Sequence, residues 1–151
     1  MNMTLLAMDA AFVGLLGFLS IYDIRHLILP DAASLALAIL GVTFVALSET
    51  PTFAEAGIGA LLGAGILWVA RLLFRHLRHT DGLGLGDVKL LAAGGLWIGW
   101  SGIGPALFIA TLAGLIAYGL RAIRVGRIET ELPLPFGPFL SFGIATIHFM
   151  T

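Results

Sequence analysis

The chain has 151 residues, of which 59% are hydrophobic and 11% are charged, and its formal net charge is −1. Soluble domains usually carry about 25% charged residues, so this composition excludes a water-soluble globule; disorder, which needs low hydrophobicity and high charge, is excluded as well. No cysteine is present, which excludes disulfides, thiol catalysis and cysteine-ligated metal sites, and the small net charge indicates no nucleic-acid partner.

Six apolar stretches predict an all-α membrane helix bundle with six transmembrane helices in one domain, residues 1–151. In chain order they are residues 3–22, 32–47, 56–73, 88–100, 103–120 and 135–150. A span needs about 20 apolar residues, so the fourth stretch has to extend into the glycine-rich segment before it or lie in thinned bilayer. No Lys or Arg occurs in the first 22 residues, so we interpret the first stretch as a retained span and not as a signal peptide.

The basic residues occur only after the first stretch, around the connection between the third and fourth, and after the fifth. They are Arg25, Arg71, Arg75, Arg78, Lys89, Arg121, Arg124 and Arg127. The positive-inside rule assigns these connections to the cytoplasm, so both termini are expected outside. Trp97 and Trp100 then fall at the outer end of the fourth stretch, where indole rings favour the membrane interface.

Two aspartates are expected at the cytoplasmic ends of their helices. Asp23 follows the first stretch and Asp87 begins the fourth, so both lie at the same membrane depth. Two neighbouring carboxyl groups share one proton, because both cannot ionise easily. The ionised group can activate a water and the protonated one can donate to a peptide carbonyl. The pattern therefore predicts an aspartic protease, without assigning the two roles.

Glycines at 82, 84 and 86 precede Asp87. Without a Cβ they let another backbone approach closely, which would leave room for an extended substrate beside the carboxyl groups. The alternative is a flexible loop without such a role, since short glycine patterns are weak signals.

Four segments resemble the type IV prepilin peptidases, a family of bacterial inner-membrane aspartic proteases also known as prepilin leader peptidases. GLGDVKLL (84–91) resembles the GxGD motif with its following K-L-L, and DIRHLILPD (23–31) resembles the second signature of the family. PLPFGPF (133–139) resembles the late PFGP element, and AAGGLWIGW (92–100) resembles the segment after GxGD. The resemblance covers essentially the whole chain, in the order that the family shows.

This resemblance implies that Asp23 and Asp87 are catalytic and that Gly84 and Gly86 belong to the backbone of the active site. It implies cleavage of the leader peptide of type IV prepilins or of type II secretion pseudopilins at the cytoplasmic face of the inner membrane. Many members also methylate the product through a domain with paired CxxC motifs. Because this chain has no cysteine, we expect no methyltransferase activity, no cofactor and no metal.

Other charged residues have two interpretations each. Lys89 is expected to snorkel to the interface, or to bind lipid phosphate or an acidic group of the substrate. Arg25 and His26 are expected to anchor the helix end, or to stabilise the charged form of Asp23. Asp9 lies inside the first stretch, and no functional interpretation follows from its position.

The histidine pair of the basic connection and the Pro-Phe-Gly-Pro segment near the C-terminus also have alternative interpretations. His76 and His79 form His-x-x-His, but the basic residues around them favour a solvated loop over a metal site. Pro135, Gly137 and Pro138 are consistent with a helix-entry turn, or with close packing of the glycine beside the aspartates.

Two other functions compete with the prepilin peptidase prediction. Residues 22–23, 83–87 and 105–107 resemble the YD, LGLGD and PAL elements of signal peptide peptidases and presenilins, but those proteins are larger and their PAL element lies farther from GxGD. The alternative outside the proteases is a small transporter or accessory subunit with a proton- or cation-binding aspartate pair. Transporter sites usually lie near the midplane between repeats, whereas these aspartates end helices and no repeat is visible.

Overall fold

The computed structural model describes residues 3–78, 84–125 and 135–150, which form five α-helices and no strand. The helices are α1 (Met3–His26), α2 (Asp31–Leu47), α3 (Phe53–Arg78), α4 (Leu85–Val125) and α5 (Gly137–Met150). The all-α prediction is therefore confirmed for this part of the chain.

Three of the helices, α1, α3 and α4, are long and apolar enough to cross a membrane. Helices α2 and α5 are also apolar but shorter, with 17 and 14 residues. Many large apolar side chains of all five helices are exposed on the outside of the bundle, which suits contact with lipid rather than water. A membrane helix bundle is thus the class of fold that this sequence forms.

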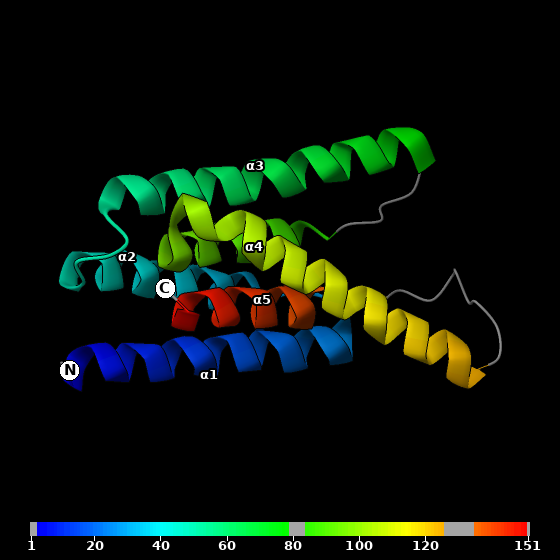
Figure 1. Ribbon diagram of the computed structural model, residues 1–151, viewed down its shortest axis with the longest axis horizontal. Helices are drawn as coiled ribbons and strands as arrows, with labels where there is room; N and C mark the ends of the chain where they lie inside the picture. The colour runs from blue at the N-terminus through cyan, green and yellow to red at the C-terminus, as the bar shows by residue number, and fades with distance from the viewer. Residues whose placement is uncertain (1–2, 79–83, 126–134, 151) are drawn as a thin grey trace.

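The predicted fourth and fifth stretches belong to one 41-residue helix, α4, which is broken at Gly99. Gly99 has φ 65° and ψ −179°, a conformation that residues with a side chain rarely adopt. At this point the chain reverses, so the second leg of α4 runs back toward the end where the first leg began (Figure 1). Two helical stretches are therefore present where they were predicted, joined by a reversal at one residue.

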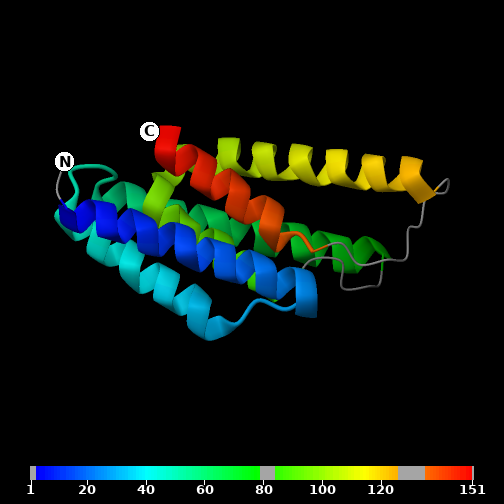
Figure 2. The ribbon, with the colours of Figure 1, turned by 90° about the horizontal axis from the view of Figure 1, so that it is seen from below.

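The first leg of α4 is the central element of the bundle, since α4 packs against α2, α3 and α5. Helix α5 lies between α1 and the second leg of α4 (Figure 2). Trp97 in the first leg is 1% exposed, and its indole N–H donates a 3.0 Å hydrogen bond to the carbonyl of Leu37 in α2. The prediction that Trp97 lies at the membrane interface is wrong, because this side chain fills the core; Trp100 is half exposed.

Helices α3 and α4 meet at a contact between backbones. A Cβ placed on Gly59 would lie 2.5 Å from the carbonyl oxygen of Gly95, and a Cβ on Gly95 would overlap the backbone of Gly59. Glycine at both positions therefore permits the close approach, as small residues do in membrane helix packing. This contact places the first leg of α4 against the apolar face of α3.

We predict that Gly59→Ala lowers the thermal stability of the bundle, because its new methyl group would force α3 and α4 apart. Overpacking of this kind typically costs about 1–3 kcal/mol. Gly57→Ala is the matched control, since a Cβ on Gly57 has no atom within 4 Å. Thermal unfolding in detergent, followed by circular dichroism, measures the difference; equal melting temperatures for the two variants would contradict the proposed close contact.

Candidate active site

Asp23 lies in the last turn of α1 and is buried, with 6% of its surface exposed. Its Oδ2 accepts a 3.0 Å hydrogen bond from the backbone N–H of Gly137. Gly137 is the first residue of α5, and the first N–H groups of a helix have no partner inside the helix. The start of α5 therefore holds this carboxyl group, and its partial positive charge suits a negative one.

The structure explains why a glycine stands at position 137 in the PFGP element. A Cβ on Gly137 would lie 2.7 Å from Oδ2 of Asp23, so any side chain here would displace the carboxyl group or the start of α5. The N–H of Leu140 donates a 3.0 Å hydrogen bond to the carbonyl of Phe136, which forms the first turn of α5. The segment is thus both a helix entry and a close contact with Asp23.

Asp87 lies in the first turn of α4 and is buried, with 7% of its surface exposed. The backbone of Gly84 donates a hydrogen bond to its carboxyl group, and a Cβ on Gly84 would lie 3.3 Å from Oδ2. A Cβ on Gly86 would instead lie 2.7 Å from the Cβ of Leu29. Gly86 therefore lets the start of α4 pack against Leu29, in the segment of chain that follows α1.

The two aspartates lie at the same end of the bundle. The charge of Asp23 acts electrostatically on Asp87, although the two residues come from helices far apart in the sequence. Each carboxyl group receives one backbone N–H, from Gly137 and from Gly84. Two buried carboxyl groups that interact in this way hold a single negative charge more easily than two. Chemically, the arrangement suits a shared proton and an activated water.

Lys89 is paired within the chain. Its Nζ lies 2.6 Å from Oδ1 of Asp31, the first residue of α2, and both side chains are substantially exposed. This ion pair joins the start of α2 to the first leg of α4, a role that neither interpretation of Lys89 had included. At the end of α1, Nδ1 of His26 lies 3.2 Å from the carbonyl oxygen of Tyr22, and the imidazole ring stacks on the ring of Tyr22.

The described residues contain no group of three or more His, Asp or Glu side chains that could hold a metal ion. His76 is exposed near the end of α3, and its predicted partner His79 lies outside the described residues. Gly82, Arg127 and the first two residues of the 133–139 segment also lie outside them.

One polar contact was not found by sequence reasoning. Asp9 of α1, for which the sequence suggested no role, lies 3.0 Å from Nε2 of His148 in α5. His148 was not singled out from the sequence. An Asp and a His inside two apolar helices are a signal for such a pair, but the register between the helices is needed to join them.

Comparison with known proteins places this bundle in a family. Residues 10–119 match the model of the type IV leader peptidase family, and the chain belongs to that family. It is 42% identical over 134 residues to a prepilin leader peptidase/N-methyltransferase of Burkholderia pseudomallei (strain 1026b), covering 88% of this chain and 43% of that protein. No solved structure matches the chain significantly.

Two further relatives are similar over most of the chain. The prepilin leader peptidase/N-methyltransferase of Pectobacterium carotovorum is 36% identical over 126 residues, which is 83% of this chain and 44% of that protein. The leader peptidase HopD of Escherichia coli is 38% identical over 125 residues, which is 82% of this chain and 79% of that protein. The chain thus spans less than half the length of the first two relatives, and most of the length of the third.

We predict that Gly137→Ala displaces the start of α5 from Asp23, because its methyl group does not fit beside Oδ2, and that any leader cleavage by this chain falls strongly. A misplacement of about 1 Å can lower a rate by about 100-fold. Gly104→Ala is the control, since a Cβ on Gly104 has no atom within 4 Å. Leader cleavage by the two variants, compared at equal helix content, measures the effect; full activity of Gly137→Ala would show that the contact is dispensable.

Proposed function

We propose that this protein is an aspartic endopeptidase that removes the leader peptide of type IV prepilins or pseudopilins, with Asp23 and Asp87 as its catalytic residues. The observation that carries the proposal is that these two aspartates, predicted as a pair, are both buried at one end of the bundle and interact electrostatically. Membership in the type IV leader peptidase family supports the same reaction and the same class of substrate.

In the proposed reaction, one ionised carboxylate takes a proton from a water, whose oxygen attacks the carbonyl carbon of the scissile peptide bond. The protonated carboxyl group donates its proton to the carbonyl oxygen, which gives a tetrahedral intermediate. The C–N bond then breaks, and the leaving amine takes up a proton from the aspartate pair. The backbone N–H groups of Gly137 and Gly84 stabilise the remaining negative charge on either carboxyl group.

We further propose that the aspartate end of the bundle faces the cytoplasm of a bacterial inner membrane, with both termini on the other side. The ends of α1, α3 and α4 that carry basic residues lie on the same side of the bundle as the start of α5 (Figure 1). Basic residues there include Arg25, Arg75, Lys89 and Arg124, and cytoplasmic ends are the ones that carry such residues. The two legs of α4 then cross separately, for six crossings in total.

The test is cleavage of a purified type IV prepilin by this protein in detergent or membranes, with the product identified by intact mass. We expect loss of a leader-sized fragment, and a fall of about 100-fold or more with Asp23→Asn or Asp87→Asn, as removal of a general acid or base typically causes. Glu49→Gln is the control, because Glu49 is exposed in the connection at the opposite end.

Two results would contradict the proposal in different ways. Cleavage that survives Asp23→Asn or Asp87→Asn would show that the catalytic assignment is wrong. No cleavage of several different prepilins by folded wild-type protein would argue against the function itself and in favour of a non-enzymatic membrane role for the aspartates.

The same mass spectra test the expectation on methylation. We expect a product without a methyl group at its new N-terminus when S-adenosylmethionine is supplied, because the chain has no cysteine to form the paired CxxC motifs. A product that is heavier by the mass of one added methyl group would show that this chain methylates without those motifs.

A further inference from the structure

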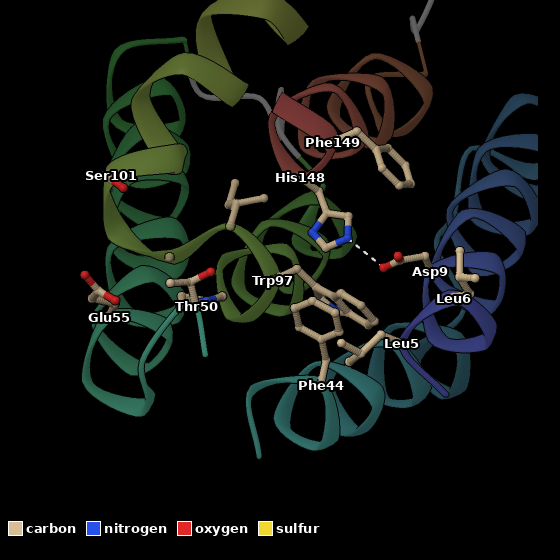
Figure 3. A pocket seen from close by; sticks show the side chains of 13 residues that line it. Leu5, Leu6, Asp9, Phe44, Thr50, Glu55, Trp97, Ser101, His148 and Phe149 are labelled. Atoms are coloured by element: carbon tan, nitrogen blue, oxygen red, sulfur yellow. Dashed lines mark hydrogen bonds and ion pairs between the residues drawn. The ribbon is translucent and has the colours of Figure 1, made fainter. Parts of the chain in front are cut away.

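Helices α1 and α5 make a second polar contact, at the end of the bundle opposite the aspartate pair. Oδ1 of Asp9 lies 3.0 Å from Nε2 of His148, and the two side chains are 29% and 8% exposed. Figure 3 shows His148 and Asp9 pointing toward one another from their two helices. A carboxylate and a nearly buried imidazole on apolar helices are costly unless they are paired, so this contact calls for a role.

The spacing of the two contacts makes them the two ends of one interface. Asp9 and Asp23 are about 21 Å apart along α1, and Gly137 and His148 are about 16 Å apart along α5, at 1.5 Å per residue. Both spacings are close to whole numbers of helical turns, so each helix presents its two contact residues on one face. Buried apolar side chains lie on these helices between the contacts; they are Phe12, Leu16, Leu19, Leu140, Ile144 and Ile147.

His148 is held in place from several sides. Its ring centroid lies 4.7 Å from that of Phe12, 5.3 Å from that of Phe44 and 5.4 Å from that of Trp97. Phe12 lies on α1, Phe44 on α2 and Trp97 on the first leg of α4, so the imidazole ring contacts three other helical segments. Its position is therefore fixed relative to the whole bundle. A bond from Asp9 to this ring therefore fixes the outer end of α1 against α5.

Asp9 is the carboxylate that faces His148 in this region. The pair borders a cavity of about 530 Å³ that Glu55 also lines. Glu55 is engaged elsewhere, since its Oε2 accepts 2.9 Å hydrogen bonds from the backbone N–H and the hydroxyl of Thr52. In Figure 3 the Glu55 side chain lies across the cavity from His148.

We propose that Asp9 and His148 are positioning residues for the peptidase: their contact clamps the axial position of α5 on α1 and thereby places the N–H of Gly137 at Asp23. This inference rests on the proposed function. Apolar side chains allow small sliding movements between helices, whereas a hydrogen bond tolerates donor–acceptor distances of only about 2.7–3.2 Å. A slide of α5 by one residue, about 1.5 Å, breaks the Gly137–Asp23 bond.

The kinetic test compares substitutions that remove the clamp with substitutions that keep it. Asp9→Ala and His148→Ala are expected to lower kcat about 10- to 100-fold with KM unchanged, because a small misplacement affects the chemical step. Asp9→Asn and His148→Gln keep an acceptor and a donor and are expected to retain most of the wild-type kcat. Thr146→Ala is the matched control, since its hydroxyl bonds to Phe142 within α5.

A structural readout separates this inference from the proposed function. Hydrogen exchange measured on the peptide that contains Gly137 is expected to be faster in Asp9→Ala and His148→Ala than in wild type, and unchanged in Thr146→Ala. This measurement reports the position of α5 even if no prepilin is cleaved. Conversely, normal cleavage by wild type with unaffected alanine variants would leave the peptidase proposal intact and overturn the clamp.

A reversible cross-link tests whether position alone matters. The chain contains no cysteine, so the double variant Asp9→Cys, His148→Cys carries the two thiols that a short, reducible bifunctional reagent would join. We expect low kcat before bridging, recovery toward the wild-type kcat after bridging, and renewed loss on reduction. The proposal would be overturned if the alanine variants had the same kcat and the same Gly137 hydrogen exchange as wild type. It would also be overturned if kcat stayed low after the two cysteines were bridged.

Discussion

The hydrogen bond from the N–H of Gly137 to Asp23 joins the last helix of the described chain to the first at the candidate site. It connects the last turn of α1 to the first residue of α5, and it allows no side chain at position 137. A carboxyl group buried at the end of an apolar helix needs such a partner, because neither lipid nor the helix's own backbone supplies a donor there. The contact therefore determines how α5 has to approach α1, and with it the packing of the rest of that interface.

Helix α4 brings the second aspartate to the same place. Its first leg packs against α3 at the backbone contact of Gly59 and Gly95 and reverses at Gly99. The reversal returns the second leg to the aspartate end, where α5 packs between it and α1 (Figure 2). Asp87 thereby lies in the first turn of a helix that is surrounded by others, and its carboxyl group accepts a hydrogen bond from the backbone of Gly84.

Much of this arrangement can be predicted from residue patterns, because membrane helices have a strong local signal. The lengths of the apolar stretches predicted each helix that the structure describes. The positions of Asp23 and Asp87 at the ends of such stretches made them candidates for the site. The glycine of the PFGP element was also recognised as a possible close contact. Trp97 was misplaced, because an indole suits both a membrane interface and a core; only the hydrogen-bond acceptor at Leu37, from another helix, decides between them.

The sequence by itself determined the class of protein, the positions of the apolar helices and the family, and it proposed the two aspartates, since these depend on composition, on hydropathy over short windows and on local motifs. The tertiary structure decided which side chains meet: Gly137 with Asp23, Lys89 with Asp31, and Asp9 with His148. Such pairs depend on the rotation and axial register of helices that are distant in sequence. Apolar helices in lipid tolerate many axial registers, so only the combined packing of the five described helices selects a single register.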